Sequence, residues 1–224
     1  MTPLTFQPSA VVLAAGDFPT HPVPLQALSK TTQLVCCDSA LLTLRTHPVP
    51  LAPGCTVYSI GDGDSLPLSL QHDPSVRFVH NPDQNTNDLT KAVHFCHDRG
   101  WHDLVIVGAT GRREDHTLGN ISLLTNYAEL GCRCLLLTDY GSFCTVRGTA
   151  QFQSFAGQQV SLFSLDPTAP ISAQGLRWPL CERRLTRWWE GTLNEATGNT
   201  FTVDSSAAPL LVFQTYDAKE AVPQ

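Results

Sequence analysis

The residues best suited to chemistry in this sequence are aspartates that follow short apolar runs. In "SIGDGDSL" two acids stand between glycines directly after the apolar run 56–61, and other acids follow "QLVCC", "RFVHNPDQNT" and "DLVIVGA". If these runs are parallel strands, the acids gather at the carboxyl edge of one sheet, where open α/β sheets bind ligands. The acids in these positions are Asp38, Asp62, Asp64, Asp88 and Asp115.

Carboxylates that share one crevice repel one another unless a positive charge joins them. Mg²⁺ is suited to this role, because it takes oxygen ligands and commonly pairs one or two carboxylates with substrate phosphates and water. Basic groups are expected in the same crevice, namely Lys91, Arg112, Arg113 and His116. Acids, basic side chains and a metal together favour phosphoryl transfer, whose work is positioning and charge neutralisation.

Each of these residues also has a purely structural interpretation. "GDGDS" could be only a turn, because Gly and Asp are favoured turn residues. Asp88 and Asp115 each precede a helix-like segment and could cap it. Lys91 could be a solvated helix lysine, and His116 only a polar neighbour. The placement of the acids at one expected edge, taken together, favours a site.

The first 140 residues alternate apolar runs with helix-like segments. We expect strands covered on both faces, as in a parallel sheet, at 11–16, 33–37, 56–61, 77–80, 103–109 and 133–138. One helix is expected over 87–100 and another over 115–131, with Leu118, Ile121, Leu124 and Ala128 on its apolar face. This alternation predicts an α/β layer.

After about residue 145 the pattern changes to short β-rich segments separated by Gly, Pro, Asn and Asp. They are 145–153, 158–165, 186–191, 199–205 and 209–215. These segments predict a smaller antiparallel β-sandwich after an N-terminal parallel-sheet α/β domain. We place the two domains at residues 1–142 and 143–224.

Composition narrows the class of protein. A hydrophobic share of 42% with 15% charged residues is typical of a globular chain, and a net charge of −6 disfavours nonspecific nucleic-acid binding. The apolar run 10–16 is too short for a membrane span, and no basic residue precedes it as in a secretory signal. The eight cysteines have no CxxC or zinc-type spacing, so we expect a reduced, cytoplasmic protein.

Several catalytic signatures are missing from the sequence. There is no GxxxxGK[ST] phosphate loop and no GxSxG nucleophile turn, and "AAGDFPT" has too few glycines for a dinucleotide fingerprint. A noncatalytic ligand-binding protein stays open, because residue positions alone do not show turnover.

The order of motifs resembles the thiamine pyrophosphokinase (thiamine diphosphokinase) family over nearly the whole chain. The matching pieces are "LAAGDFP", "CDSA", "IGDGDSL", "DQNTNDLTKAV", "VGATGRREDHTLGNISLL", "GLRWPL" and "GTLNE". The resemblance implies Mg²⁺-dependent transfer of the terminal diphosphate of ATP to thiamine, with release of AMP. It also implies a homodimer whose active site lies between the α/β domain of one subunit and the sandwich of the other.

The resemblance also implies roles for single residues. Asp62, Asp64 and Asp88 match the family's metal-binding acids, and Asp115 matches a further catalytic carboxylate. The positions expected around ATP are Asp38, Lys91, Arg113, His116 and Asn120. Gln84 and Asn194 match thiamine contacts, and Trp178 matches an aromatic that stacks on thiamine, as suits a flat cationic ligand. From the residues alone, Trp178 could instead be a core tryptophan of the sandwich.

The chain departs from the family pattern at Ser39, Asn85, Asn87, Arg112 and Leu193. Leu193 stands where a serine is usual beside the thiamine-contacting asparagine, so the departure concerns the acceptor more than the metal. A diphosphokinase acting on another alcohol, a hydrolase that needs no acceptor, and a noncatalytic thiamine or nucleotide binder are the alternatives.

Overall fold

The computed structural model describes residues 7–47, 49–206 and 208–218. They form two compact units, one ending at Asp139 and the other beginning at Tyr140, and each is described by itself. Among these residues, no helix combines the length and apolar character needed to cross a membrane.

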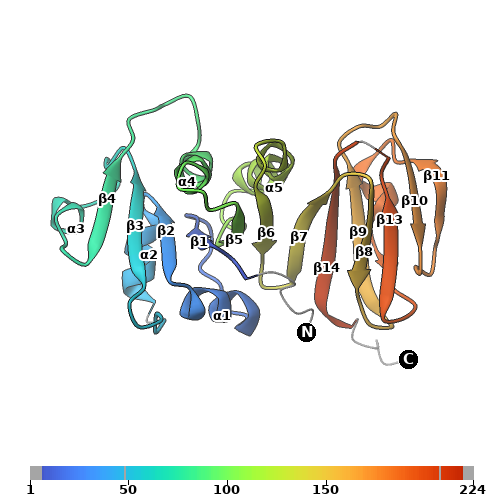
Figure 1. Ribbon diagram of the computed structural model, residues 1–224, viewed down its shortest axis with the longest axis horizontal. Helices are drawn as coiled ribbons and strands as arrows, with labels where there is room; N and C mark the ends of the chain where they lie inside the picture. The colour runs from blue at the N-terminus through green and yellow to red at the C-terminus, as the bar shows by residue number, and fades with distance from the viewer. Residues whose placement is uncertain (1–6, 48, 207, 219–224) are drawn as a thin grey trace. The chain divides into compact units, whose positions relative to one another are not determined.

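The N-terminal unit is an α/β layer. Its strands are β1 (Ala10–Leu13), β2 (Gln33–Cys37), β3 (Thr56–Gly61), β4 (Val76–His80), β5 (Asp103–Val107) and β6 (Arg133–Leu137). They pair in parallel in the order β6-β5-β1-β2-β3-β4, which can be followed in Figure 1. The expected parallel sheet is therefore confirmed, with strand ends differing by at most a few residues from those predicted.

The helices of this unit are α1 (Pro22–Lys30), α2 (Ala40–Thr46), α3 (Leu68–Gln71), α4 (Asp88–His97) and α5 (Glu114–Glu129). Side chains from α1 and α2, including Leu28 and Leu41, join the core cluster that contains Val11 and Val105. Helix α4 contacts β1, β2 and β3, and α5 contacts α4 and β6. Strands β1 and β2 are buried nearly throughout because helices cover the sheet.

The predicted apolar face of α5 is partly wrong. Leu124 is buried as expected, but Leu118 is 51% exposed, and Tyr127 is the large side chain that fills the core. The hydroxyl groups of Tyr127 and Thr90 lie 3.0 Å apart and link α5 to α4 by a hydrogen bond. The first half of α5, which carries Leu118, is therefore a surface segment.

The C-terminal unit is a pair of antiparallel sheets. One sheet has the order β12-β9-β14-β7, from Asn194–Glu195, Gln158–Ser164, Leu210–Ala218 and Gly141–Val146. The other has the order β11-β10-β13-β8, from Leu180–Arg184, Pro170–Gln174, Thr200–Asp204 and Thr149–Gln153. Side chains of both sheets share one core cluster with Val160, Ile171, Phe201 and Val212. The expected sandwich is confirmed.

One expected strand of the sandwich is wrong. Residues 186–191 carry the short 3₁₀ helix η1 (Trp188–Gly191). The carboxylate of Glu190 accepts hydrogen bonds from the backbone N–H groups of Thr186 and Arg187, at 2.7 and 3.3 Å. Two tryptophans favour a strand in isolation, but this capping by Glu190 stabilises a helical turn.

Candidate functional site

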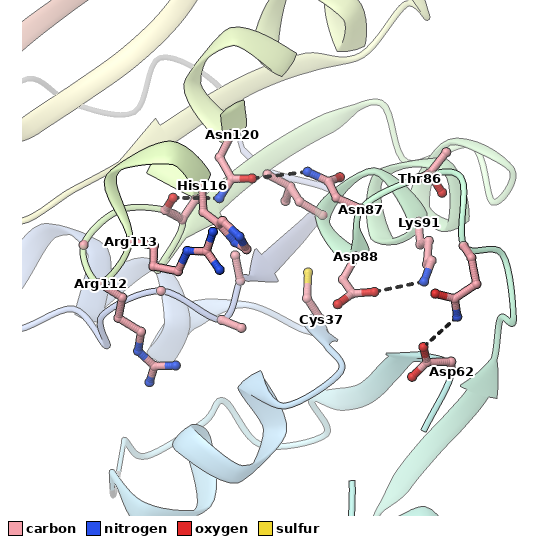
Figure 2. Close-up of a pocket in the computed structure, with 17 residues that line it drawn as sticks. Cys37, Asp62, Thr86, Asn87, Asp88, Lys91, Arg112, Arg113, His116 and Asn120 are labelled. Carbon is pink, nitrogen blue, oxygen red and sulfur yellow. Dashed lines mark hydrogen bonds and ion pairs between the residues drawn. The ribbon is translucent and has the colours of Figure 1, made fainter. Parts of the chain in front are cut away.

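A cavity of about 520 Å³ opens at the carboxyl edge of the parallel sheet. It is lined by residues at or just after the carboxyl ends of β1, β2, β3 and β5 and by residues around the beginnings of α4 and α5. Figure 2 shows Asp62, Asp88 and Lys91 on one side, Arg112, Arg113 and His116 on the other, and the Cys37 thiol between them. The cavity therefore has two acids and a lysine on one side and two arginines with a histidine on the other, across a space of ligand size.

The loops after β1 and β5 form a tightly packed backbone ledge in this cavity. The N–H of Gly16 donates to the carbonyl of Gly108 at 2.7 Å, and the N–H of Asp17 donates to the carbonyl of Thr110 at 2.9 Å. A Cβ atom on Gly16 would collide with these carbonyls, and one on Gly111 would collide with the Asp17 carboxylate. Only glycine therefore allows the two loops to approach this closely.

Asp62 is held by its own turn and by Gln84. Its Oδ1 accepts from the Asp64 backbone N–H at 3.1 Å, and its Oδ2 accepts from the Gln84 amide at 3.0 Å. These hydrogen bonds lower the pKa of Asp62 below its ordinary value, so the group is an anion at neutral pH. Asp64 supplies its backbone to this turn, while its side chain is exposed and does not line the cavity.

Lys91 and Asp88 form an ion pair within the first turn of α4. Lys91 Nζ donates to Asp88 Oδ1 at 3.0 Å, with the lysine side chain 3% exposed and the aspartate side chain 45% exposed. The helix begins here because the Asn87 side chain caps it, accepting from the Thr90 N–H at 2.9 Å. A nearly enclosed ammonium is thus held at the cavity wall with a fixed partner.

The cap residue Asn87 also reaches α5. Its Nδ2 lies 3.4 Å from Asn120 Oδ1, and Asn120 Nδ2 donates to the carbonyl of Ala109 at 2.8 Å. Asn120 is therefore fixed from two sides, by the loop after β5 and by the start of α4.

Asp115 and Arg113 form a two-bond pair at the beginning of α5. Arg113 Nε and Nη2 donate to the two carboxylate oxygens at 3.1 and 2.6 Å, and the His116 N–H adds a third bond at 2.9 Å. The Arg113 bonds are the largest cause of the lowered pKa of Asp115. Asp115 does not line the cavity, whereas Arg113 does. The carboxylate therefore holds the Arg113 guanidinium through both of its oxygens.

Asp38 is the buried acid of this region. The residue is 5% exposed, has a left-handed backbone with φ of +36°, and its Oδ1 has no hydrogen-bond partner within the described residues. Burial raises the pKa of Asp38, opposed by a hydrogen bond from Ser65, while the charges of Asp88 and Asp62 raise it further. Burying a carboxylate oxygen without a hydrogen-bond partner costs free energy, and such an oxygen is typical of a site that binds a ligand.

The acids near the cavity fit an open Mg²⁺ site and not a closed one. Among the described residues no group of three or more His, Cys, Asp or Glu side chains is gathered closely enough to hold a metal ion. Two carboxylates, Asp62 and Asp88, line the cavity, and both act electrostatically on the buried Asp38. Such a set fits Mg²⁺ that takes its other ligands from phosphates and water, and does not form a closed protein cage.

The C-terminal unit carries the remaining predicted residues. Trp178 is 54% exposed, and the Arg177 guanidinium carbon lies 5.1 Å from the centre of its ring. Asn194 is buried, and its side chain is hydrogen-bonded to the Trp178 backbone. The exposure of Trp178 excludes the interpretation of this residue as a core tryptophan.

The structure thus brings most of the predicted nucleotide and metal residues around one cavity, together with Gln84, which was predicted to contact thiamine. The nucleotide and metal residues there are Asp62, Asp88, Lys91, Arg113, His116 and Asn120. Asp38, Asp64 and Asp115 do not line it, and Trp178 and Asn194 belong to the other unit. Sequence reasoning assigned no site role to Cys37, although its place at the carboxyl end of "QLVCC" was a signal for the cavity. It also missed the link from Asn87 to Asn120, for which the sequence holds no signal.

Comparison with protein families gives a model match for each unit. The model described as the thiamin pyrophosphokinase catalytic domain matches residues 25–136, and the one described as the thiamin pyrophosphokinase substrate-binding domain matches residues 141–213. The chain belongs to the thiamin pyrophosphokinase family. The cavity of the N-terminal unit is therefore made largely of residues within the matched catalytic domain.

Relatives agree with the membership in this family. The chain is 32% identical over 110 residues to thiamine pyrophosphokinase 1 of Oryza sativa subsp. japonica, covering 44% of this chain and 41% of that protein. It is 31% identical over 75 residues to thiamin pyrophosphokinase 1 of Caenorhabditis elegans, covering 31% of this chain and 30% of that protein. These alignments span less than half the length of the curated relatives.

Solved structures of the thiamin pyrophosphokinase family share the fold over nearly the whole chain. The thiamine pyrophosphokinase of Bacillus subtilis superposes with a TM-score of 0.74 and 18% identity, covering 93% of this chain and 99% of that one. The thiamin pyrophosphokinase of Candida albicans superposes with a TM-score of 0.73 and 16% identity, covering 93% and 90%. At such identities the likeness concerns the fold.

Proposed function

We propose that this protein is a thiamine diphosphokinase, which transfers the terminal diphosphate of ATP to the hydroxyl group of thiamine and releases AMP. The observation that carries the proposal is the cavity of a matched catalytic domain in which Asp62 and Asp88 face Arg113 and His116. The Arg113 guanidinium on one wall suits phosphate oxygens, and the acids on the other suit the metal ions that accompany ATP.

In the proposed reaction the hydroxyl oxygen of the acceptor attacks the β-phosphorus of ATP. The bond from that phosphorus to the oxygen bridging the α- and β-phosphates breaks, and this oxygen leaves with AMP. The proton of the alcohol passes to a carboxylate or to water. Asp115 is disfavoured as the proton acceptor, because Arg113 engages both of its oxygens and lowers its pKa.

We assign the nucleotide to Arg113, His116, Asn120 and Lys91, with Asp38 at the base of this region. Lys91 supports this assignment because its ammonium is already fixed by Asp88, so little side-chain entropy is lost when a phosphate binds. Arg113 supports it in the same way, since Asp115 holds the guanidinium at the cavity mouth. The residues thereby neutralise charge without rearrangement.

Mg²⁺ would be held by Asp62 and Asp88, with Asp64 as a third acid on the strength of the family resemblance. The ion would neutralise the phosphates and polarise the phosphorus that is attacked. The chain's own contribution is to keep Asp62 ionised through the Gln84 and Asp64 hydrogen bonds.

For the acceptor we propose that Trp178 stacks on thiamine, with Gln84 and Asn194 as further acceptor-site residues. The half-exposed indole supports this assignment, because an aromatic face attracts a flat cation. A homodimer is proposed from the family resemblance, and sedimentation equilibrium would test it. A cytoplasmic location is proposed from the eight free cysteines, five of them buried, since such thiols persist in reducing compartments.

The test is to incubate the purified protein with Mg²⁺ and ATP, with and without thiamine, and to quantify AMP and thiamine diphosphate. We expect AMP release that depends on thiamine and equals the thiamine diphosphate formed. AMP with pyrophosphate and no acceptor would indicate a hydrolase. No thiamine-dependent AMP would contradict the proposal and direct the search to other alcohols or to a binding role.

A further inference from the structure

The side chain of Asn194 makes three hydrogen bonds to the backbone of Trp178 and Glu195. Its Oδ1 accepts from the Trp178 N–H at 3.1 Å, and its Nδ2 donates to the Trp178 carbonyl at 2.7 Å. The same Oδ1 accepts from the Glu195 N–H at 2.9 Å. Asn194 is 7% exposed, so these bonds are shielded from water.

These bonds extend a short strand pairing. Leu176 and Ala196 form an isolated antiparallel bridge, and the Arg177 N–H donates to the Glu195 carbonyl at 2.8 Å. At the next residue, Trp178, the backbone N–H and carbonyl are bonded by the side chain of Asn194. The carboxamide can replace a backbone partner in this pairing because it offers an acceptor and a donor, as a peptide group does. Among side chains of this length only asparagine carries both, so aspartate or leucine could not replace it in this role.

The pairing matters because the Trp178 ring has little else to orient it. The indole is 54% exposed, and its described neighbour is the Arg177 guanidinium, which lies 3.6 Å from the Glu195 carboxylate. For a side chain at the surface, the direction of the Cα–Cβ bond sets where the ring can go. The Asn194 bonds on both sides of the Trp178 Cα fix that direction.

We infer that Asn194 is a positioning residue that holds the aromatic platform for the acceptor, rather than a residue that binds the acceptor itself. The inference rests on the proposed function, in which Trp178 stacks on thiamine. It revises the expectation that Asn194 contacts thiamine, because the hydrogen bonds to Trp178 and Glu195 engage its oxygen twice and one of its two N–H donors.

A double-mutant cycle separates the two roles. We expect Asn194→Ala to raise the KM for thiamine about tenfold, because both hydrogen bonds to the Trp178 backbone are lost, with the KM for ATP unchanged. In the Trp178→Ala background, Asn194→Ala should change the KM for thiamine no further, because there is no ring to position. Effects that multiply in the double variant would overturn the inference. If Asn194→Ala does not fold, Asn194→Asp preserves the volume and the two accepted bonds, and replaces the donor to the Trp178 carbonyl with a negatively charged oxygen.

Amide hydrogen exchange at Trp178, followed by NMR, tests the clamp without reference to turnover. We expect exchange of the Trp178 N–H to accelerate at least about tenfold in Asn194→Ala. The matched control is Thr197→Val, which removes a bond of 3.0 Å to the Gly175 carbonyl in the same pairing and leaves Trp178 untouched. Unchanged exchange in Asn194→Ala would refute the clamp. A wild-type protein without thiamine-dependent AMP release would contradict the proposed function, while the exchange result would still decide the clamp.

Discussion

The two units prepare their proposed binding residues by different physical means. In the α/β unit the groups at the cavity are charged, and they are held by partners of opposite charge or by amides, as Lys91 is held by Asp88 and Asp62 by Gln84. In the sandwich the exposed indole of Trp178 is held through its backbone by the Asn194 carboxamide. In the α/β unit, ion pairs and hydrogen bonds between side chains fix the charged groups. In the sandwich, hydrogen bonds to the backbone fix the residue that carries the indole.

The difference follows from the ligands proposed for each region. Phosphates and metal ions interact strongly with charge over several ångströms, so the sign and pairing of the side chains matter most. A stacked ring needs contact over a face, so its orientation matters more than its charge. Substitutions that remove charge should therefore be severe in the first region, and substitutions that remove shape should be severe in the second.

The largest effect is expected from removing charge at the cavity. Asp62→Asn keeps an oxygen for the Asp64 N–H but removes the negative charge, so kcat should fall at least about a hundredfold in an AMP-release assay. The matched control is Asp166→Asn, because Asp166 accepts from the Thr168 N–H at 2.9 Å in a similar turn of the other unit. Equal activity of Asp62→Asn and wild type would remove Asp62 from the site.

The second effect concerns shape in the sandwich. Trp178→Ala should raise the KM for thiamine about tenfold while the KM for ATP stays constant, because a stacking face is lost. Trp189→Ala is the control, since Trp189 is 67% exposed in the same unit and has no proposed contact with the acceptor. If both variants changed the KM for thiamine equally, the stacking role of Trp178 would be unsupported.

The third effect is a gain in stability at a cost in activity. Burial raises the pKa of Asp38, so the folded protein holds this proton more tightly than the unfolded chain does. The stabilisation from this group is complete below the ordinary pKa and is lost as the pH rises through the raised value. At pH 7 Asp38→Asn should therefore increase the free energy of unfolding by about 1 kcal/mol, with reduced turnover.

Urea denaturation at two pH values checks this prediction. The advantage of Asp38→Asn should vanish at about pH 3, where the carboxyl group is protonated in both states. Asparagine is well suited to the left-handed backbone at this position, so no new strain is expected. Asp98→Asn, at an exposed side chain, should change stability little at either pH. A variant less stable than wild type at pH 7 would contradict the assignment of Asp38 as a costly buried acid.

The smallest effect is expected at the beginning of α5. Asp115→Asn weakens the hold on Arg113, and because the pair is exposed we expect the KM for ATP to rise only about threefold, with stability nearly unchanged. Asp103→Asn is the matched control, because Asp103 makes the same two-bond pair with Arg133 at the start of β5. A loss of kcat comparable to that of Asp62→Asn would show that Asp115 acts in the chemical step.

The fold was predictable where burial produces a clear hydrophobic pattern in the sequence. Strands β2 and β3 were predicted to the residue, because strands covered on both faces are apolar without interruption. The apolar face of α5 was not, because Leu118 is exposed and Tyr127 takes the buried place. The turn at Trp188 was missed because Glu190 caps it through the backbone, and such tertiary hydrogen bonds override propensity.

The site was predictable as a location and less so as an arrangement. The carboxyl edge of a parallel sheet follows from topology, which is why Asp62 and Asp88 were expected together. Asp62 lines the cavity, whereas Asp64 contributes only a backbone N–H that bonds the Asp62 carboxylate. This difference depends on the conformation of one turn, and the two acids look alike in the sequence. The bond between Asn194 and Trp178 depends on a pairing of distant segments, which local patterns do not contain.

The central place of β1 in the sheet has a consequence for synthesis of the chain. Its neighbours are β2 and β5, so Ala10 finds its partner Leu104 only after most of the α/β unit has been made. The ledge between Gly16 and Gly108, and the wall that begins at Arg113, come still later in the order of translation. A nascent chain that has reached only α4 therefore lacks part of the cavity lining, and the nucleotide proposed to bind there can assist folding only once β5 and the beginning of α5 have left the ribosome.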